Sequence, residues 1–145
     1  MWAYLATGGL WESTDAGGQW TRVRDDNVLF PLAIDRGGST RLLGADVNGL
    51  VASDDGERTW TPLGAPPTYP MTALAGSSDG MVLYAESPDG LDRSDDGGRA
   101  WTKTTFGGSP FAIATSSDGS TIAVVARTTE FFRSSDRGDS WPGPN

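Results

Sequence analysis

The stretch Ser94-Asp95-Asp96-Gly97-Gly98-Arg99-Ala100-Trp101 decides the fold, because its form Ser-x-Asp-x-Gly-x-x-Trp recurs along the chain. We call this motif the box. The other copies are Ser13-Thr14-Asp15-Ala16-Gly17-Gly18-Gln19-Trp20, Ser53-Asp54-Asp55-Gly56-Glu57-Arg58-Thr59-Trp60 and Ser134-Ser135-Asp136-Arg137-Gly138-Asp139-Ser140-Trp141. The boxes follow one another at about 40 residues, which is the repeat length of four-stranded propeller blades. The sequence therefore predicts an all-β chain, a β-propeller segment of about four antiparallel meanders.

Each box combines residues that suit a tight turn between two strands. An Asp carboxylate accepts hydrogen bonds from N–H groups two or three residues further on, and glycine adopts a positive φ without steric cost. Tryptophan adds a large apolar surface with one N–H donor, suited to seal a blade edge against its neighbour. The second box carries Glu57 where the others have glycine. There we expect a rearranged turn that uses Gly56, or a local strain on the order of 1 kcal/mol.

Composition limits the classes of function. The chain has 145 residues, a net charge of −8 and only 11 Lys and Arg, so neither nucleic acid nor an anionic membrane is an expected partner. It has no Cys and no His, which excludes disulfides, thiolate or imidazole metal sites and catalysis by Cys or His. No apolar run approaches the roughly 18 residues of a membrane span, so we expect no membrane insertion. We also expect no cofactor and no metal.

Each repeat divides into four short predicted strands, here A to D. The A strands begin at Pro31, Pro70 and Pro110, since a residue without an N–H suits the start of a strand. The B strands are predicted at 2–7, 41–45, 81–85 and 121–126, the C strands at 9–13, 49–53, 90–94 and 130–134, and the D strands from each box tryptophan onward. We expect one domain, 1–145, with repeats at about 1–29, 30–68, 69–109 and 110–145. The first repeat begins without an A strand, and the last ends in a truncated D strand.

The repeated boxes carry a family resemblance. With the motif in register four times, the chain resembles the Asp-box, or BNR-repeat, β-propellers over nearly its whole length. That family includes sialidases, xyloglucanases, sortilin-type receptors and photosystem II assembly factors. The resemblance implies that the boxes lie on the face away from any active site and are structural. It also implies an extracytoplasmic setting, although residues 1–7 are expected to form a strand and not a signal peptide.

A ligand site is expected at the end opposite to the boxes. In an up-and-down meander the A–B and C–D connections lie at one end and the B–C and D–A connections at the other. The boxes occupy the first end, so a site should lie at the second, where loops converge on the central channel. The candidate ligand-binding residues there are Asp46, Asn48, Tyr69, Asp89, Arg127 and Glu130. Phe106 is a further loop residue that we consider for contact with a ligand.

Glycoside hydrolysis normally needs two carboxylates roughly 5–9.5 Å apart across the scissile bond. The acidic residues of the candidate loops are Asp46, Glu86, Asp89 and Glu130. The segment 46–49, Asp-Val-Asn-Gly, is similar to the Asp-x-Gly-Gly segment that carries a catalytic Asp in xyloglucanase-type propellers, with Asn48 departing from it. Asp46 is therefore the single catalytic candidate. The Arg-Ile-Pro segment of sialidases is absent.

We expect a non-catalytic binding or scaffold module, because folding accounts for the box residues and no catalytic set is complete in the candidate loops. An alternative is a fragment of a secreted glycoside hydrolase, sialidase-like or xyloglucanase-like, whose remaining catalytic residues lie outside this chain. A third is a minimal or designed repeat protein without a ligand, in which two copies complete a ring by self-association at their open edges. The ligand of a binding module would be a carbohydrate or a protein.

Overall fold

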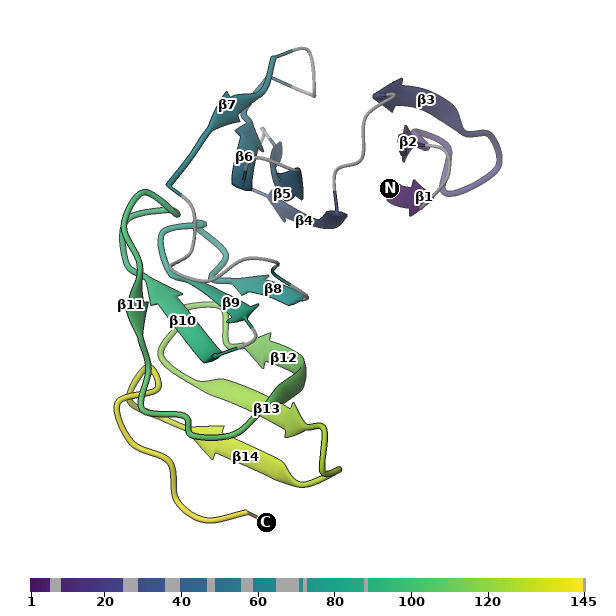
Figure 1. The fold of residues 1–145 in the computed structure, drawn as a ribbon. Helices are drawn as coiled ribbons and strands as arrows, with labels where there is room; N and C mark the ends of the chain where they lie inside the picture. Colours follow the sequence, from purple (N-terminus) through teal and green to yellow (C-terminus); the bar gives the residue numbers. More distant parts are fainter. Residues whose placement is uncertain are drawn as a thin grey trace.

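The structure is a computed structural model, and it describes residues 1–5, 9–24, 29–35, 40–46, 49–55, 59–64, 71, 73–87 and 89–144. Within these residues all regular secondary structure is β (Figure 1). The strands are β1 (Trp2–Leu5), β2 (Gly9–Glu12), β3 (Thr21–Arg24), β4 (Leu29–Asp35), β5 (Thr40–Asp46), β6 (Gly49–Ser53), β7 (Thr61–Pro62), β8 (Ala73–Gly76), β9 (Leu83–Ser87), β10 (Gly90–Ser94), β11 (Thr102–Lys103), β12 (Pro110–Thr115), β13 (Ile122–Ala126) and β14 (Phe131–Ser134).

The strands form four antiparallel sheets, which we call blades 1 to 4. Blade 1 consists of β1-β2-β3, blade 2 of β4-β5-β6-β7, blade 3 of β8-β9-β10-β11 and blade 4 of β12-β13-β14. Strands that follow one another in sequence are neighbours in the sheet, so each blade is a meander of adjoining hairpins. The blades lie one after another along an arc, with blades 1 and 4 at its two ends (Figure 1). The predicted all-β architecture of up-and-down meanders is confirmed.

Strand limits differ from the predicted ones at several positions. The A strand of blade 3 begins at Ala73 and not at Pro70, and its B strand is Leu83–Ser87 and not 81–85. β4 begins at Leu29, before Pro31, and its pairing with β5 shifts register between Leu29 and Leu32. Pro31 therefore lies at an irregularity, where its missing N–H interrupts no regular ladder. The prediction that the D strands start at the box tryptophans is wrong by one residue, because the tryptophans still belong to the turns. These strands begin at Thr21, Thr61 and Thr102. The truncated D strand predicted from Trp141 onward is wrong, because the described residues 141–144 form no strand and blade 4 has three strands.

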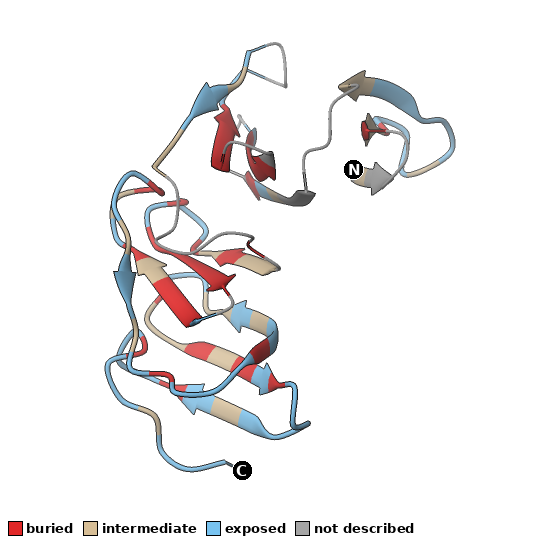
Figure 2. Cartoon of the chain, in the orientation of Figure 1, coloured by how far each residue is buried: buried red, intermediate tan, exposed pale blue. Residues whose placement is uncertain are grey.

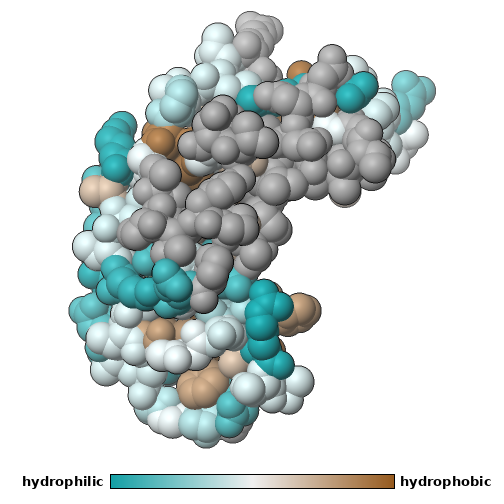
Figure 3. Space-filling model, in the orientation of Figure 1, coloured by the Kyte–Doolittle hydropathy of each residue, from teal (hydrophilic) through white to brown (hydrophobic). Residues whose placement is uncertain are grey.

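Two apolar clusters lie between successive blades, and Figure 2 shows the buried residues concentrated on the strands that face one another there. The cluster between blades 2 and 3 consists of Ile34, Leu43, Ala45, Leu50, Ala52, Met71, Leu83 and Ala85. The cluster between blades 3 and 4 consists of Val82, Tyr84, Leu91, Phe106, Ile122, Val124 and Ala126. Since burial of a Leu or Ile contributes about 1.5–3 kcal/mol, packing of blade on blade stabilises the fold. Outside, polar side chains cover much of the described surface, with hydrophobic patches near the lower end of the arc (Figure 3).

Each box is closed by hydrogen bonds of its serine and its aspartate. The serine hydroxyl donates to the carboxylate two residues on, at 2.6–3.0 Å. The same carboxylate accepts from the backbone N–H four residues on, which belongs to Gln19, Thr59, Ala100 or Ser140. The carboxylate thus reaches further along the chain than the two or three residues expected from turn chemistry. In the third box it also accepts from Arg99, three residues on.

The turn also requires two successive residues with positive φ. The angles are 60° and 98° at Ala16 and Gly17, 73° and 93° at Gly97 and Gly98, and 62° and 85° at Arg137 and Gly138. A residue with a Cβ in this region is strained by roughly 1–2 kcal/mol, and the hydrogen bonds of the box offset that strain. The expectation for Gly56 and Glu57 of the second box lies outside the described residues.

The same hydrogen bonds keep the box carboxylates ionised. The Ser134 hydroxyl, then the hydroxyl and N–H of Ser140, lower the pKa of Asp136 to about 2. The hydroxyl and N–H of Thr59 lower the pKa of Asp55 to about 2 as well. Because the folded pKa lies below the ordinary value of 3.8, this contribution to stability is present above that value and is lost as the pH falls towards 2.

Replacing Ser134 by alanine is expected to lower the free energy of unfolding by about 1.5 kcal/mol. The buried Ser134 hydroxyl donates to Asp136 at 2.6 Å and accepts from the N–H of Gly138 at 2.8 Å. Alanine leaves the N–H of the buried Gly138 without its acceptor. Urea unfolding followed by tryptophan fluorescence measures the change. The exposed neighbour Ser135 provides the control, and an equal loss in Ser135→Ala would contradict this account.

The box of a blade contacts the A–B turn of the same blade. In blade 3 the N–H of Gly97 donates to the carbonyl of Met81 at 2.9 Å, and in blade 4 the N–H of Arg137 donates to the carbonyl of Ser120 at 3.0 Å. These bonds place the A–B and C–D connections at one end of the blades. The B–C and D–A connections therefore lie together at the other end.

Candidate functional site

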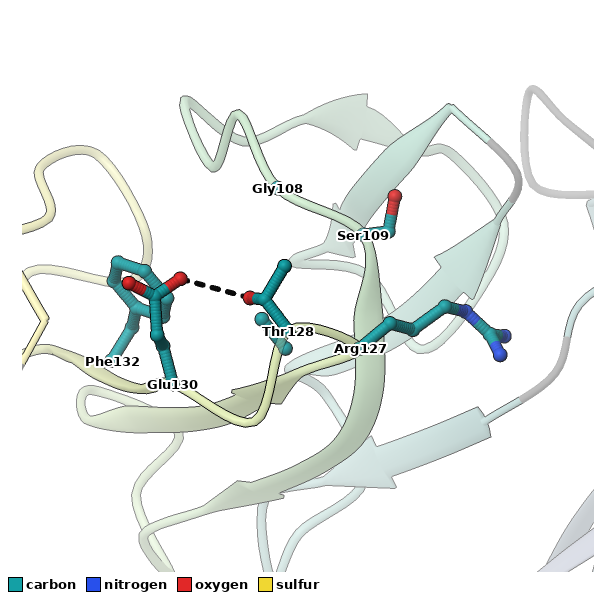
Figure 4. A pocket seen from close by; sticks show the side chains of 7 residues that line it. Gly108, Ser109, Arg127, Thr128, Glu130 and Phe132 are labelled. Atoms are coloured by element: carbon teal, nitrogen blue, oxygen red, sulfur yellow. Dashed lines mark hydrogen bonds between the residues drawn. The ribbon is translucent and has the colours of Figure 1, made fainter.

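The end opposite to the boxes holds a cavity of about 290 Å³ between the two kinds of connection found there (Figure 4). Ser109 comes from the D–A connection before β12, and Arg127 and Glu130 come from the B–C connection between β13 and β14. The two segments are joined through the backbone, since the N–H of Arg127 donates to the carbonyl of Ser109 at 2.9 Å. The other lining residues are Gly108, Ala126, Thr128 and Phe132.

Arg127 is held at this cavity by a buried carboxylate of the neighbouring blade. Its Nη2 lies 3.3 Å from Oε1 of Glu86, at the end of β9 in blade 3. The Glu86 side chain is 5% exposed, whereas that of Arg127 is 54% exposed. Burial raises the pKa of Glu86, and the hydrogen bond and positive charge of Arg127 lower it in part. The ion pair fixes the guanidinium on one side and leaves its other donors accessible to a carboxylate or carbonyl of a ligand.

The remaining polar groups of the cavity stand apart from the guanidinium. The Thr128 hydroxyl donates to Oε2 of Glu130 at 2.8 Å, and the two side chains point towards each other (Figure 4). The Arg127 side chain extends in the opposite direction. Phe132 is half-buried beside Glu130 and contributes an aromatic wall. The cavity therefore offers a carboxylate and hydroxyl groups beside an aromatic ring, and the Arg127 guanidinium lies apart from them, against Glu86.

The structure brings two of the six candidate ligand residues, Arg127 and Glu130, to this cavity. Asp89 is exposed in the turn between β9 and β10 and does not line it. The backbone of Asp46 ends β5, but the Asp46 side chain lies outside the described part of the structure. The same holds for Asn48 and Tyr69 as whole residues.

Phe106, which was considered for contact with a ligand, is a core residue. It is buried in the cluster between blades 3 and 4. Its ring centroid lies 5.3 Å from that of Phe132 and 4.8 Å from that of Trp141. The Gly-rich sequence around Phe106 indicates a loop. The loop folds back, however, and places the Phe106 ring between those of Phe132 and Trp141.

Three residues that line the cavity were not among the predicted site residues: Ser109, Thr128 and Phe132. Ser109 and Thr128 stand in loops that were predicted for this end, so their place in the repeat was the available signal. Phe132 lies on β14 two residues after Glu130, and its alternation with Phe131 is what turns it towards the cavity and the core.

Among the described residues, no three His, Cys, Asp or Glu side chains gather in a way that could hold a metal ion. No helix in that part of the chain is long and apolar enough to cross a membrane. The two carboxylates near the cavity, Glu86 and Glu130, each accept from a protein donor, Arg127 and Thr128 respectively.

Solved structures share this arrangement of blades. The chain is similar to YCF48 from Cyanidioschyzon merolae, with a TM-score of 0.67 and 14% identity over 99% of this chain and 52% of that one. It is similar to the GH74 xyloglucanase from Xanthomonas campestris, with a TM-score of 0.61 and 24% identity over 99% of this chain and 23% of that one. For a structure of YCF48 bound to D1 peptide the TM-score is 0.60 and the identity 20%, over 81% of this chain and 39% of that one. The chain spans about half or less of the length of these proteins. No family model matches the sequence, and no curated relative is found.

These likenesses define the class of fold. The chain is an all-β segment of a β-propeller, as the spacing of the boxes predicts. Because every identity is below 25%, the likeness concerns the fold and carries no activity with it.

Proposed function

We propose that the chain is a non-catalytic propeller module of the Asp-box type, one domain over 1–145 with the four repeats given above, and that it binds a segment of another protein. The observation that carries the proposal is the half-exposed side chain of Arg127, which lines the cavity and whose guanidinium is fixed by the buried Glu86. In this proposal the box residues serve the fold. The cavity at the opposite end serves binding.

The chemistry of the cavity suits a peptide. A peptide presents carbonyl oxygens and N–H groups at successive positions, with apolar side chains between them. Arg127 donates to a carbonyl or carboxylate, Glu130 accepts from an N–H, and Phe132 contacts an apolar side chain. A structural neighbour, YCF48, is known in a structure bound to D1 peptide, which supports a protein ligand for this fold.

A glycoside hydrolase fragment is the second candidate function, favoured by the likeness to the GH74 xyloglucanase. That chemistry requires two carboxylates that face one sugar. Among the described residues at this end, Glu86 is buried against Arg127 and Glu130 accepts from Thr128. This use of the two carboxylates supports the binding module over the hydrolase.

The test is a selection for peptides followed by measured affinities. A phage-displayed heptapeptide library is panned on the purified chain and counter-selected on the Arg127→Ala variant, and the recovered peptides are synthesised with a fluorescent label. We expect Arg127→Ala to weaken their binding at least tenfold, about 1.4 kcal/mol, in fluorescence anisotropy. Arg99→Ala removes an exposed arginine at the box end and is expected to leave binding unchanged. Glu130→Gln is a second cavity variant that does not disturb the ion pair with Glu86.

Two results would overturn the proposal. One is that no recovered peptide distinguishes the Arg127→Ala and Glu130→Gln variants from the unaltered chain. The other is release of reducing sugar from xyloglucan by the chain, with loss of that release in Asp46→Asn. The second result would establish the hydrolase instead.

A further inference from the structure

Blade 4 leaves one apolar face exposed. The exposed fractions of Phe111, Val125 and Phe131 are 65%, 37% and 41%. In β13, Ile122 and Val124 belong to the core shared with blade 3, so Val125 points to the other side of the sheet. Two hollows, of about 400 and 140 Å³, lie along this face. A contiguous exposed face of large apolar side chains marks an interaction surface.

Blade 3 uses the corresponding face to hold blade 4. Leu91 of blade 3 and Phe131 of blade 4 both stand three residues before a box serine. Leu91 is fully buried in the cluster between blades 3 and 4. Tyr84 of the same face is also fully buried, and its hydroxyl donates to the carbonyl of Gly119 in blade 4 at 2.9 Å. The exposed face of blade 4 therefore corresponds to the face of blade 3 that blade 4 covers.

Arg133, on the exposed face of blade 4, indicates which kind of surface this face binds, by comparison with Arg93 of blade 3. Arg93 precedes the box serine of blade 3, and its Nη1 lies 2.8 Å from the carbonyl oxygen of Arg137 and 3.0 Å from Oδ1 of Asp139. Both acceptors belong to the box of blade 4, so Arg93 fastens one blade to the box of the next. Arg133 holds the same position on blade 4 and is exposed. The face is thus suited to a further blade that carries a box.

Blade 1 presents a matching surface at the other end of the arc. Its box tryptophan, Trp20, is 37% exposed, whereas Trp101 and Trp141 pack against the clusters shared with the blade before them. Ala16 of its box corresponds to Arg137, and φ is 60° at Ala16 and 62° at Arg137, so the two turns present their carbonyl oxygens alike. The Asp139 carboxylate has no counterpart in blade 1, because Gly18 occupies the equivalent position of its box.

We propose that the exposed face of blade 4 binds the box side of blade 1 of a second copy of this chain. Two copies then meet head to tail twice and close one ring, as heterologous contacts do when the rotation closes. Two arcs of four blades give a ring within the range of about four to eight blades that propellers show.

Light scattering coupled to size exclusion tests the association. We expect a molar mass of about twice the 15.3 kDa of the chain, independent of concentration. Phe131→Asp places a charge on the interface and is expected to give the mass of a single chain. The matched control is Met81→Asp, because Met81 is equally exposed, at 41%, but lies at the A–B turn of blade 3. Arg133→Glu is a second interface variant at an exposed position, and circular dichroism verifies that each variant is folded.

A mixing experiment tests the direction of the contact. Trp20→Glu disables the box side of blade 1, so it should also be a single chain when alone. Mixed with Phe131→Asp, it retains one intact interface per pair, and the mass is expected to return to that of two chains. A symmetric contact between two copies of blade 4 would show no such recovery. Because the chain has no cysteine, Arg133→Cys with Ala16→Cys adds a second readout, in which a short bismaleimide should join two copies.

Three results would overturn the proposal. The unaltered chain could have the mass of one copy at concentrations on the order of 100 μM, where an interface of this kind should be occupied. The mixture of the two variants could remain at the mass of one chain. The mass could rise with concentration beyond two copies, which would show an open chain of contacts and no closed ring.

Discussion

Replacing Arg127 by alanine is expected to lower the free energy of unfolding by about 2 kcal/mol at pH 8 and by much less at pH 4. The reason is Glu86, whose nearly inaccessible carboxylate takes its hydrogen bond from Nη2 of Arg127 at 3.3 Å. Without Arg127 that carboxylate is left charged in the interior. Removal of one partner from a fully buried pair costs about 3–5 kcal/mol, and solvent around the half-exposed arginine reduces the figure here.

The dependence on pH follows from the direction of the shift. Burial raises the pKa of Glu86, and Arg127 lowers it only in part, so alanine at position 127 allows the pKa to rise further. The folded state then binds a proton more tightly than the unfolded chain. The stability from such a group is fully present below the unfolded pKa and is lost as the pH rises through the folded pKa. The deficit of the variant therefore grows from pH 4 to pH 8.

Urea unfolding at the two pH values measures this difference. The double variant Glu86→Gln with Arg127→Ala should recover most of the stability at pH 8, because the amide carries no charge. Arg99→Ala, an exposed arginine of the third box, serves as the control and should change stability little at either pH. A deficit of the same size at pH 4 and pH 8 would show that Arg127 stabilises the fold by packing and not through the charge of Glu86.

The blades were predictable because their determinants are local. A serine two residues before an aspartate, followed by a glycine, sets a turn through hydrogen bonds that span at most four residues. The sequence therefore shows where strands β10 and β14 end, and the period shows how many such turns exist. The A–B turns contain the same device, since Ser77 donates to Asp79 and Ser116 to Asp118. These serines recur with the A–B turns, but they were not predicted to take part in them.

The candidate site was predictable only in part because its determinants cross between blades. Glu86 and Arg127 are 41 residues apart, and nothing periodic links an acid in one repeat to a base in the next. The end of the molecule at which they lie follows from the meander, but the pairing depends on how blade 4 packs on blade 3. Phe106 is the converse case, since its Gly-rich surroundings indicate a loop and only the packing against Phe132 places it inside.

Replacing Asp92 by valine is expected to raise the free energy of unfolding by about 2 kcal/mol at pH 8. Asp92 is fully buried on β10, opposite Ala85 of the core between blades 2 and 3. Among the described residues no donor lies at hydrogen-bond distance from either of its carboxylate oxygens. Val51 and Phe132 occupy the same position, two residues before the box serine, in blades 2 and 4. An apolar side chain of valine's shape therefore already fits this place in the repeat.

The pH dependence separates the charge of Asp92 from its shape. Burial raises the pKa of Asp92, and the nearby Ser87 hydroxyl and the Lys103 charge lower it only in part. The unaltered chain thus loses stability as the pH rises through the folded pKa, and the advantage of valine should increase from pH 4 to pH 8. Asp92→Asn keeps the shape without the charge, so it should show the same increase with a smaller gain. If both variants were less stable than the unaltered chain at every pH, the carboxylate would be held by favourable interactions, and the cost assigned to its burial would be refuted.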